Sequence, residues 1–166
     1  MPRVIVRALH DEDRNEIAQW HYPGDLAIYD PGPGAADLRA PDHVALASPY
    51  GELVGYGTFG RQAQVPGGAY PVVSAAVDLG LGLRPDLVGM GYGADALFAL
   101  IEEGKRRLAP ARFRVTVASA NARATALVER AGFRRAHRFE RPTDEREFVQ
   151  YERDAMQAGL DPSRPG

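Results

Sequence analysis

Three glycines at alternate positions stand in the stretch "VGMGYGADA", and they are the first feature of the sequence with a clear chemical use. Gly89, Gly91 and Gly93 carry no side chains, so backbone N–H groups there can approach an anion closely. The apolar residues that follow have helical spacing, and a helix N-terminus adds about half a positive charge. The stretch therefore predicts a phosphate-binding loop that works through backbone amides. The alternative is a glycine-rich turn that only reverses the chain.

A dinucleotide-binding fingerprint is the rival interpretation, because "GMGYGA" also fits the pattern G-x-G-x-x-A. That fingerprint needs an acidic residue at the end of the next strand, where it binds a ribose. The next strand, "RFRVTVASA", ends without Asp or Glu. The strands around it also do not repeat a strand–helix–strand pattern, so a nicotinamide site is not expected.

One carboxylate lies upstream of this loop, in the stretch "AAVDLGLGL". Side chains of a strand alternate between its faces, so Asp78, Gly80 and Gly82 share one face. The two glycines predict an open channel beside the carboxylate. Asp78 is therefore a candidate general base, which would take a proton from an attacking group. The alternative is an ion pair or a turn acceptor.

Composition excludes several kinds of site. The 166-residue chain has no cysteine, which excludes disulfides, thiolate nucleophiles and cysteine metal ligands. No pair of histidines has metal-ligand spacing, so no metal is expected. A net charge of -2 differs from the strongly basic surface of nucleic-acid-binding domains. The apolar runs are too short to cross a membrane, and the N-terminus becomes charged too early for a signal peptide. We expect a cytoplasmic protein without nucleic-acid or membrane partners.

Hydrophobic periodicity and turn signals predict the strands and helices that carry these residues. We expect strands at 4–9, 43–48, 52–60, 70–85, 111–118, 133–140 and 146–153, and helices at 11–20, 94–108 and 121–132. The segment His21–Pro41 is interrupted by Pro and Gly throughout, which predicts a long loop with one short helical turn at most.

This order predicts a single α/β domain over 1–158, followed by a flexible tail over 159–166. The strand before the glycine loop, the helix after it and the next strand form a parallel crossover. The neighbouring strands are mostly antiparallel. A mixed sheet with helices on both faces follows.

Two stretches resemble signatures of the GNAT superfamily of N-acetyltransferases. "LGLRPDLVGMGYGADAL" is similar to its acyl-coenzyme-A-binding motif, and "NARATALVERAGF" is similar to its N-x-x-A-x-x-L-Y-x-x-x-G-F helix and following strand. They occur in the family's order, separated by one helix and one strand, and the resemblance covers Val4 to Arg153. It implies a GNAT fold and direct transfer of an acetyl group from acetyl-CoA to a primary amine within a ternary complex.

The resemblance also implies which residues bind acetyl-CoA. They are Leu81, Leu83, Val88, Gly89, Met90, Gly91, Tyr92, Gly93, Ala94, Asn121 and Arg123. Amides of residues 88–93 would bind the pyrophosphate, and the backbone of Leu81 and Leu83 would line the pantetheine arm. The alternative role of Asn121 is a helix cap, and that of Arg123 is a solvated helix face.

The sequence departs from the family pattern at two positions. Val88 replaces the usual Arg or Gln, which removes a side-chain donor. Val128 replaces the tyrosine that often returns a proton to the departing thiolate. Tyr92 and Tyr151 are candidates for that acid, although core packing is an alternative role for Tyr151, and water could also supply the proton. Val128 therefore leaves a second function open, a catalytically weak acyl-CoA-binding sensor or interaction module.

The acceptor amine should bind in a pocket built by residues 20–30, the hairpin over 43–60 and the last strand pair over 133–153. Tyr22 and Tyr29 could pack on the apolar part of the amine, and Asp30, with other acids of the long loop, would suit a cation. A plain surface loop with scattered charges is the alternative. The sequence leaves the acceptor open as a small-molecule or peptide amine, and the fold that it resembles commonly forms a homodimer.

Overall fold

The computed structural model describes residues 2–72 and 75–158. Within these residues seven strands form one mixed sheet in the order β1-β2-β3-β4-β5-β7-β6. The strands are β1 (Ile5–Arg7), β2 (His43–Ala47), β3 (Leu53–Phe59), β4 (Ala76–Leu83), β5 (Arg112–Ala118), β6 (Arg134–Glu140) and β7 (Glu147–Asp154). The pair β4–β5 is parallel and the other pairs are antiparallel, as the sequence predicts.

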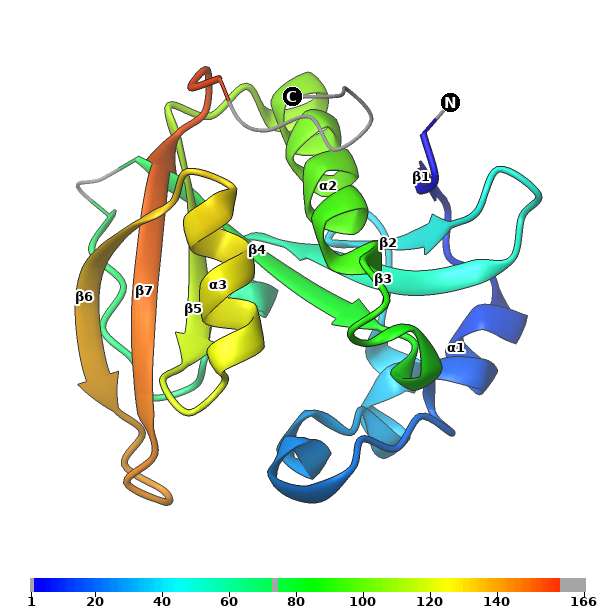
Figure 1. The fold of residues 1–166 in the computed structure, drawn as a ribbon, viewed down its shortest axis with the longest axis horizontal. Helices are drawn as coiled ribbons and strands as arrows, with labels where there is room; N and C mark the ends of the chain where they lie inside the picture. The colour runs from blue at the N-terminus through cyan, green and yellow to red at the C-terminus, as the bar shows by residue number, and fades with distance from the viewer. Residues whose placement is uncertain (1, 73–74, 159–166) are drawn as a thin grey trace.

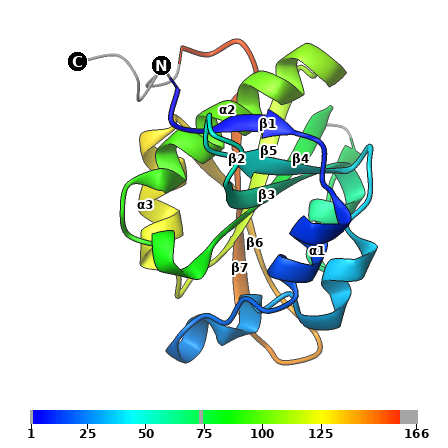
Figure 2. The same cartoon turned by 90° about the vertical axis from the view of Figure 1, so that its right-hand side faces the viewer.

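Helices cover both faces of this sheet. The α-helices are α1 (Asp11–Ile17), α2 (Tyr92–Leu108) and α3 (Ala122–Arg130). Figure 1 shows how α2 connects β4 to β5, and Figure 2 shows α2 and α3 on one side of the sheet and α1 on the other. In the described part of the chain, none of the helices is long and apolar enough to cross a membrane.

The main core lies between the sheet and the helices α2 and α3. Helix α2 buries Leu97, Leu100 and Ile101, whose spacing of three and four residues puts them on one face. They pack against strand residues such as Phe113, which is fully buried. This packing fixes the first turn of α2 at the end of β4, where the glycine loop lies.

The opposite face of β2 and β3 is covered by the His21–Pro41 loop and the helix before it. Contrary to the single short turn that the sequence predicts, the loop contains two 3₁₀ helices, η1 (Gly24–Tyr29) and η2 (Gly32–Asp37). Ala35 of η2 is fully buried with Trp20 and Ile17. This apolar contact holds the loop in a defined conformation against the sheet.

The expected strand over 70–85 is shorter in the structure, where β4 begins at Ala76. Ala75 has a φ of 51°, a left-handed conformation that ends an extended strand. Tyr70 instead belongs to a segment that covers the sheet, and its hydroxyl contacts the Thr116 hydroxyl at 3.0 Å. Residues 73–74 of the expected strand, like the expected tail 159–166, lie outside the described residues.

Candidate active site

Strands β4 and β5 separate along their length and leave a strip of unpaired backbone. Their register ends at the pair Leu79–Val115, and Figure 1 shows that the two strands diverge. On the other edge of β4, the Arg84 amide donates to the Val54 carbonyl of β3. Because antiparallel strands alternate the direction of their peptide groups, Leu81 and Leu83 direct theirs away from β3, toward the gap. The peptide groups of these two residues thus face the gap between β4 and β5, where the Leu83 carbonyl accepts from the Tyr22 hydroxyl.

The glycine loop follows directly after β4. Residues Pro85–Leu87 form a 3₁₀ turn, whose carbonyl groups accept from amides of the loop itself. The Val88 amide donates to Pro85 and the Met90 amide donates to Leu87, so neither is left for the expected phosphate contact. Gly89 and Gly91 have φ values of 81° and 85°, left-handed conformations that favour glycine.

The remaining amides of this region converge at the N-terminus of α2. The N–H groups of Tyr92, Gly93 and Ala94 belong to the first turn of the helix, where no helical carbonyl precedes them. The guanidinium of Arg123 lies against Gly89, because a Cβ atom built on this glycine would be 2.5 Å from Nη1. Helix dipole, amides and arginine together make a site that fits a pyrophosphate.

Asn121 begins helix α3 beside this site. Its side-chain oxygen accepts from the Ala124 amide at 3.1 Å, which is the helix-cap role that the sequence left open. The Asn121→Ala variant should lose about 1 kcal/mol of unfolding free energy, the usual value of an N-cap. Urea unfolding measures this loss, and calorimetry with acetyl-CoA shows whether the side chain also binds the ligand. An unchanged unfolding free energy would contradict the cap role.

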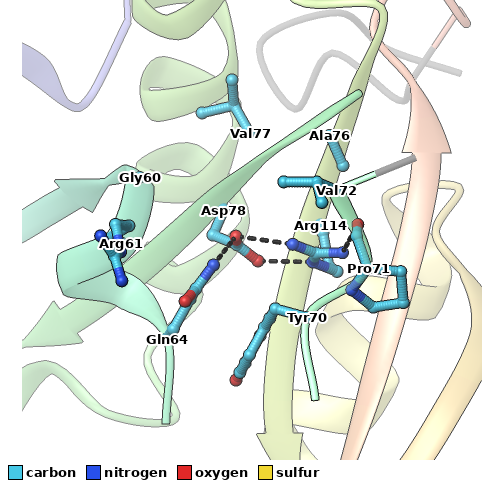
Figure 3. A pocket seen from close by; sticks show the side chains of 10 residues that line it. All are labelled: Gly60, Arg61, Gln64, Tyr70, Pro71, Val72, Ala76, Val77, Asp78 and Arg114. Carbon is cyan, nitrogen blue, oxygen red and sulfur yellow. Dashed lines mark hydrogen bonds and ion pairs between the residues drawn. The ribbon is translucent and has the colours of Figure 1, made fainter. Parts of the chain in front are cut away.

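Asp78 forms a buried ion pair instead of lying beside an open channel. Its two oxygens accept from Arg114 at 2.6 and 2.9 Å, and Oδ2 also accepts from Gln64 at 2.9 Å (Figure 3). Asp78 is 4% exposed and Arg114 is 3% exposed. The hydrogen bonds that Arg114 donates to Asp78 raise the pKa of Arg114 above its usual value. This geometry corresponds to the ion pair that the sequence left open as the alternative role of Asp78. The general-base role of Asp78 stays a prediction.

A pocket of about 220 Å³ lies beside this pair. Figure 3 shows it between the segment that follows β3 and the beginning of β4. Apolar residues of its wall include Val72, Ala76 and Val77, and Tyr70 lines it next to Arg114. Burial raises the pKa of Tyr70, which makes it a poorer proton donor than a free tyrosine. The pocket has room for a small apolar group next to a fixed ion pair.

The sequence predicts an open channel beside Gly80 and Gly82. This prediction is wrong at Gly82. A Cβ atom on Gly82 would lie 2.4 Å from the ring of Tyr56, which therefore fills this face. Tyr56 stands opposite Gly82 in the β3–β4 register, and cross-strand neighbours share a face. The glycine is thus explained by the close approach of an aromatic ring.

Tyr22 joins the His21–Pro41 loop to the end of β4. Its hydroxyl donates to the Leu83 carbonyl, one of the groups that face the gap. Burial raises the pKa of Tyr22, and the nearby Tyr56 and Asp30 raise it further, so its proton is held tightly. Asp30 accepts from the Tyr22 amide at 2.7 Å, which brings two of the three expected acceptor residues together. Tyr29 is 37% exposed on η1.

The two tyrosines considered as acids both pack against other side chains. Tyr151 is 4% exposed within the main core, which corresponds to its packing alternative. The ring of Tyr92 lies under the Arg3 guanidinium, 4.1 Å from ring centre to carbon, and packs on the apolar cluster near β1. Val128 is also buried in the main core. The acid roles of Tyr92 and Tyr151 stay predictions.

Three contributors to this region were not expected from the sequence, namely Arg114, Tyr56 and His21. Arg114 lies on a strand that the sequence predicts correctly. Side chains two residues apart on a strand, such as Arg114 and Thr116, share a face, and this pattern could have placed Arg114 on the same face as Asp78. His21 pairs with Asp30 across nine residues of irregular chain, for which the sequence carries no periodic signal. In the described residues, no group of three or more His, Asp or Glu side chains could hold a metal.

The solved structures that resemble this fold include acetyltransferases. A GNAT-family acetyltransferase from Bacillus anthracis aligns with a TM-score of 0.72 at 16% identity, covering 93% of this chain and 96% of that one. A chimera of the spermidine N-acetyltransferase SpeG from Vibrio cholerae and hSSAT gives 0.69 at 14% identity, covering 92% and 96%. The ribosomal-protein-S18-alanine N-acetyltransferase from Escherichia coli gives 0.60 at 20% identity, covering 95% and 97%.

Family models agree with these structures, whereas a comparison with curated protein sequences gives no significant match. The model for the acetyltransferase (GNAT) domain matches residues 3–134, which contain the separated strands, the glycine loop and helix α3. With most of its length matched in sequence and its whole architecture matched in space, the chain belongs to the GNAT family of acetyltransferases.

Proposed function

We propose that this protein is an N-acetyltransferase, which moves the acetyl group of acetyl-CoA to an amine by direct attack in a ternary complex. One observation carries the proposal. The edge of β4 that no longer pairs with β5 leads directly into the glycine loop, and Arg123 lies against that loop. An extended pantetheine arm with its amide groups suits the edge at Leu81 and Leu83, as an added strand would. The pyrophosphate suits the N-terminus of α2.

Acetyl-CoA supplies the activated thioester, and the chain supplies binding and orientation. Backbone amides of Gly89, Gly91 and the first turn of α2 would bind the pyrophosphate, with Arg123 as the charged partner. The backbone N–H groups at the β4 edge would stabilise the oxyanion that forms when the amine attacks. No cysteine exists to carry the acetyl group, which supports direct transfer.

The acceptor is proposed to be a small-molecule or peptide amine. The structural neighbours named above include enzymes for spermidine and for a protein alanine, so the shared fold serves amines of very different size. The acids of the His21–Pro41 loop would favour a cationic amine, and Tyr22 and Tyr29 would contact its carbon chain. We further propose that the protein acts in the cytoplasm, where acetyl-CoA is available, and that it forms a homodimer.

A catalytically weak acyl-CoA-binding module is the second candidate. Val128 favours it, because this side chain is buried in the core and has no proton to give. Burial also raises the pKa values of Tyr22 and Tyr56, which leaves them poorly suited to protonate a thiolate. In this second function, acetyl-CoA binds and the acetyl group stays on it.

Release of CoA thiol during incubation with acetyl-CoA and a panel of amines separates the two candidates. The panel should hold polyamines, amino acids, peptides with a free N-terminus and neutral arylamines. The enzyme proposal expects release well above the no-amine rate, with the acetylated amine identified by mass. Binding of acetyl-CoA without acetylation of any member would favour the binding module. Equal rates for cationic and neutral amines would count against the acidic acceptor site.

A further inference from the structure

A histidine and an aspartate are paired in the His21–Pro41 loop. His21 Nδ1 lies 3.0 Å from Asp30 Oδ2. The next residue, Tyr22, donates its hydroxyl hydrogen to the Leu83 carbonyl, which faces the gap. The pair is therefore adjacent in sequence, and through the Tyr22 amide in space, to a residue whose side chain contacts the edge that would line the acetyl arm.

Asp30 is held so that it orients the imidazole. Its other oxygen, Oδ1, accepts from the Tyr22 amide at 2.7 Å. The pKa of Asp30 lies below its usual value because the Tyr22 amide and then His21 donate to the carboxylate. An ionised Asp30 accepts from Nδ1–H and leaves Nε2 as the basic nitrogen of the neutral ring. Among the described residues Nε2 has no hydrogen-bond partner, and the His21 side chain is 78% exposed.

We propose that His21 is the general base of the acetyl transfer, with Asp30 and Tyr22 as positioning residues. This inference rests on the proposed N-acetyltransferase function. The amine nitrogen bonds to the acetyl carbonyl carbon while its proton passes to Nε2 of His21. The carbon–sulfur bond then breaks, and its electron pair leaves with the sulfur. The sulfur takes the proton from the His21 imidazolium, which restores the neutral ring and replaces the acid that Val128 cannot supply.

His21 fits this role better than Asp78 does. Both oxygens of Asp78 already accept hydrogen bonds from Arg114, and Oδ2 accepts a further one from Gln64. A proton on Asp78 would remove the negative charge nearest to the buried Arg114 guanidinium, and breaking a buried ion pair from one side is unfavourable. His21 accepts a proton at an exposed nitrogen and keeps its bond to Asp30, which then stabilises the imidazolium.

Chemical rescue tests the assignment with an amine that the wild type acetylates. His21→Ala should lower kcat by about 10² to 10⁴-fold, the usual contribution of a general base, with the Kd of acetyl-CoA unchanged. Added imidazole should restore part of kcat in His21→Ala and not in Asp30→Asn, where the ring is still present. His10→Ala is the matched control, because it removes an exposed histidine that also lies beside an aspartate, Asp13, and it should keep full activity.

The outcomes separate the base assignment from the proposed function. If the wild type acetylates an amine but His21→Ala keeps its kcat, the assignment is wrong and the function stands. A loss in His21→Ala that imidazole does not restore also overturns it, and a comparable loss in folded Asp78→Asn would then return the base role to Asp78. If the wild type acetylates no amine, the proposed function and this assignment fail together.

Discussion

Arg114→Met should lower the free energy of unfolding by about 3–5 kcal/mol, the range for breaking a buried ion pair from one side. The substitution keeps most of the side-chain volume but leaves the Asp78 carboxylate buried without its positive partner. Asp78 and Arg114 are 4% and 3% exposed, so water cannot replace the lost bonds. Arg114 also donates to the Pro71 carbonyl at 3.3 Å, which ties the covering segment to the sheet.

Arg112→Met is the matched control on the same strand. Arg112 is about half exposed, and its partners Glu152 and Asp154 lie at 3.8 and 3.3 Å. Exposed pairs of this kind contribute about 0–1 kcal/mol, so this variant should unfold almost like the wild type. Urea unfolding of both variants measures the difference. Equal and small losses would show that the Asp78–Arg114 pair does not stabilise the closed end of the β4–β5 gap.

Gly89→Ala should weaken acetyl-CoA binding by about tenfold or more. The φ of 81° is strained for alanine by about 1–2 kcal/mol, and 1.4 kcal/mol corresponds to a tenfold change in affinity. The new Cβ would also lie 2.5 Å from Arg123 Nη1, so the guanidinium must move away from the loop. Both effects disturb the groups proposed to bind the pyrophosphate.

Gly51→Ala separates this effect from backbone strain alone. Gly51 has a φ of 92° in the β2–β3 turn, and nothing lies within 4 Å of a Cβ atom built on it. This variant should lose stability and keep the wild-type Kd, which calorimetry with acetyl-CoA measures for both proteins. A wild-type Kd for Gly89→Ala would contradict the assignment of the loop to the phosphate.

Much of the fold is predictable from local pattern. The β2–β3 and β6–β7 hairpins, helix α3 with its Asn121 cap and the parallel crossover all lie where periodicity and turn residues place them. The start of β4 is predicted wrongly, for a reason that is not local. The residues "YPVV" have the composition of a strand, but Tyr70 lies outside the sheet and its hydroxyl contacts the Thr116 hydroxyl. These two residues are forty-six positions apart, so the local sequence gives no sign of the contact.

The candidate site is predictable where backbone does the binding and less so where side chains meet. The glycine loop follows from the absence of side chains, although Val88 and Met90 use their amides within a turn that the sequence does not reveal. The pairing of His21 with Asp30 depends on how η1 folds back on the loop. The ring of Tyr56 over Gly82 depends on the β3–β4 register. Such contacts come from tertiary packing, which overrides residue pattern.

Calorimetric titration with acetyl-CoA, with NAD as the control, tests whether the glycine loop and the β4 edge bind acetyl-CoA. We predict saturable one-to-one binding of acetyl-CoA and no binding of NAD, because the glycine loop is preceded by an edge suited to pantetheine and the strand after it ends without an acidic residue for a ribose. Absence of heat with acetyl-CoA, or equal binding of NAD, would contradict this prediction. The loop at Gly89–Gly93 would then be only a turn between β4 and α2.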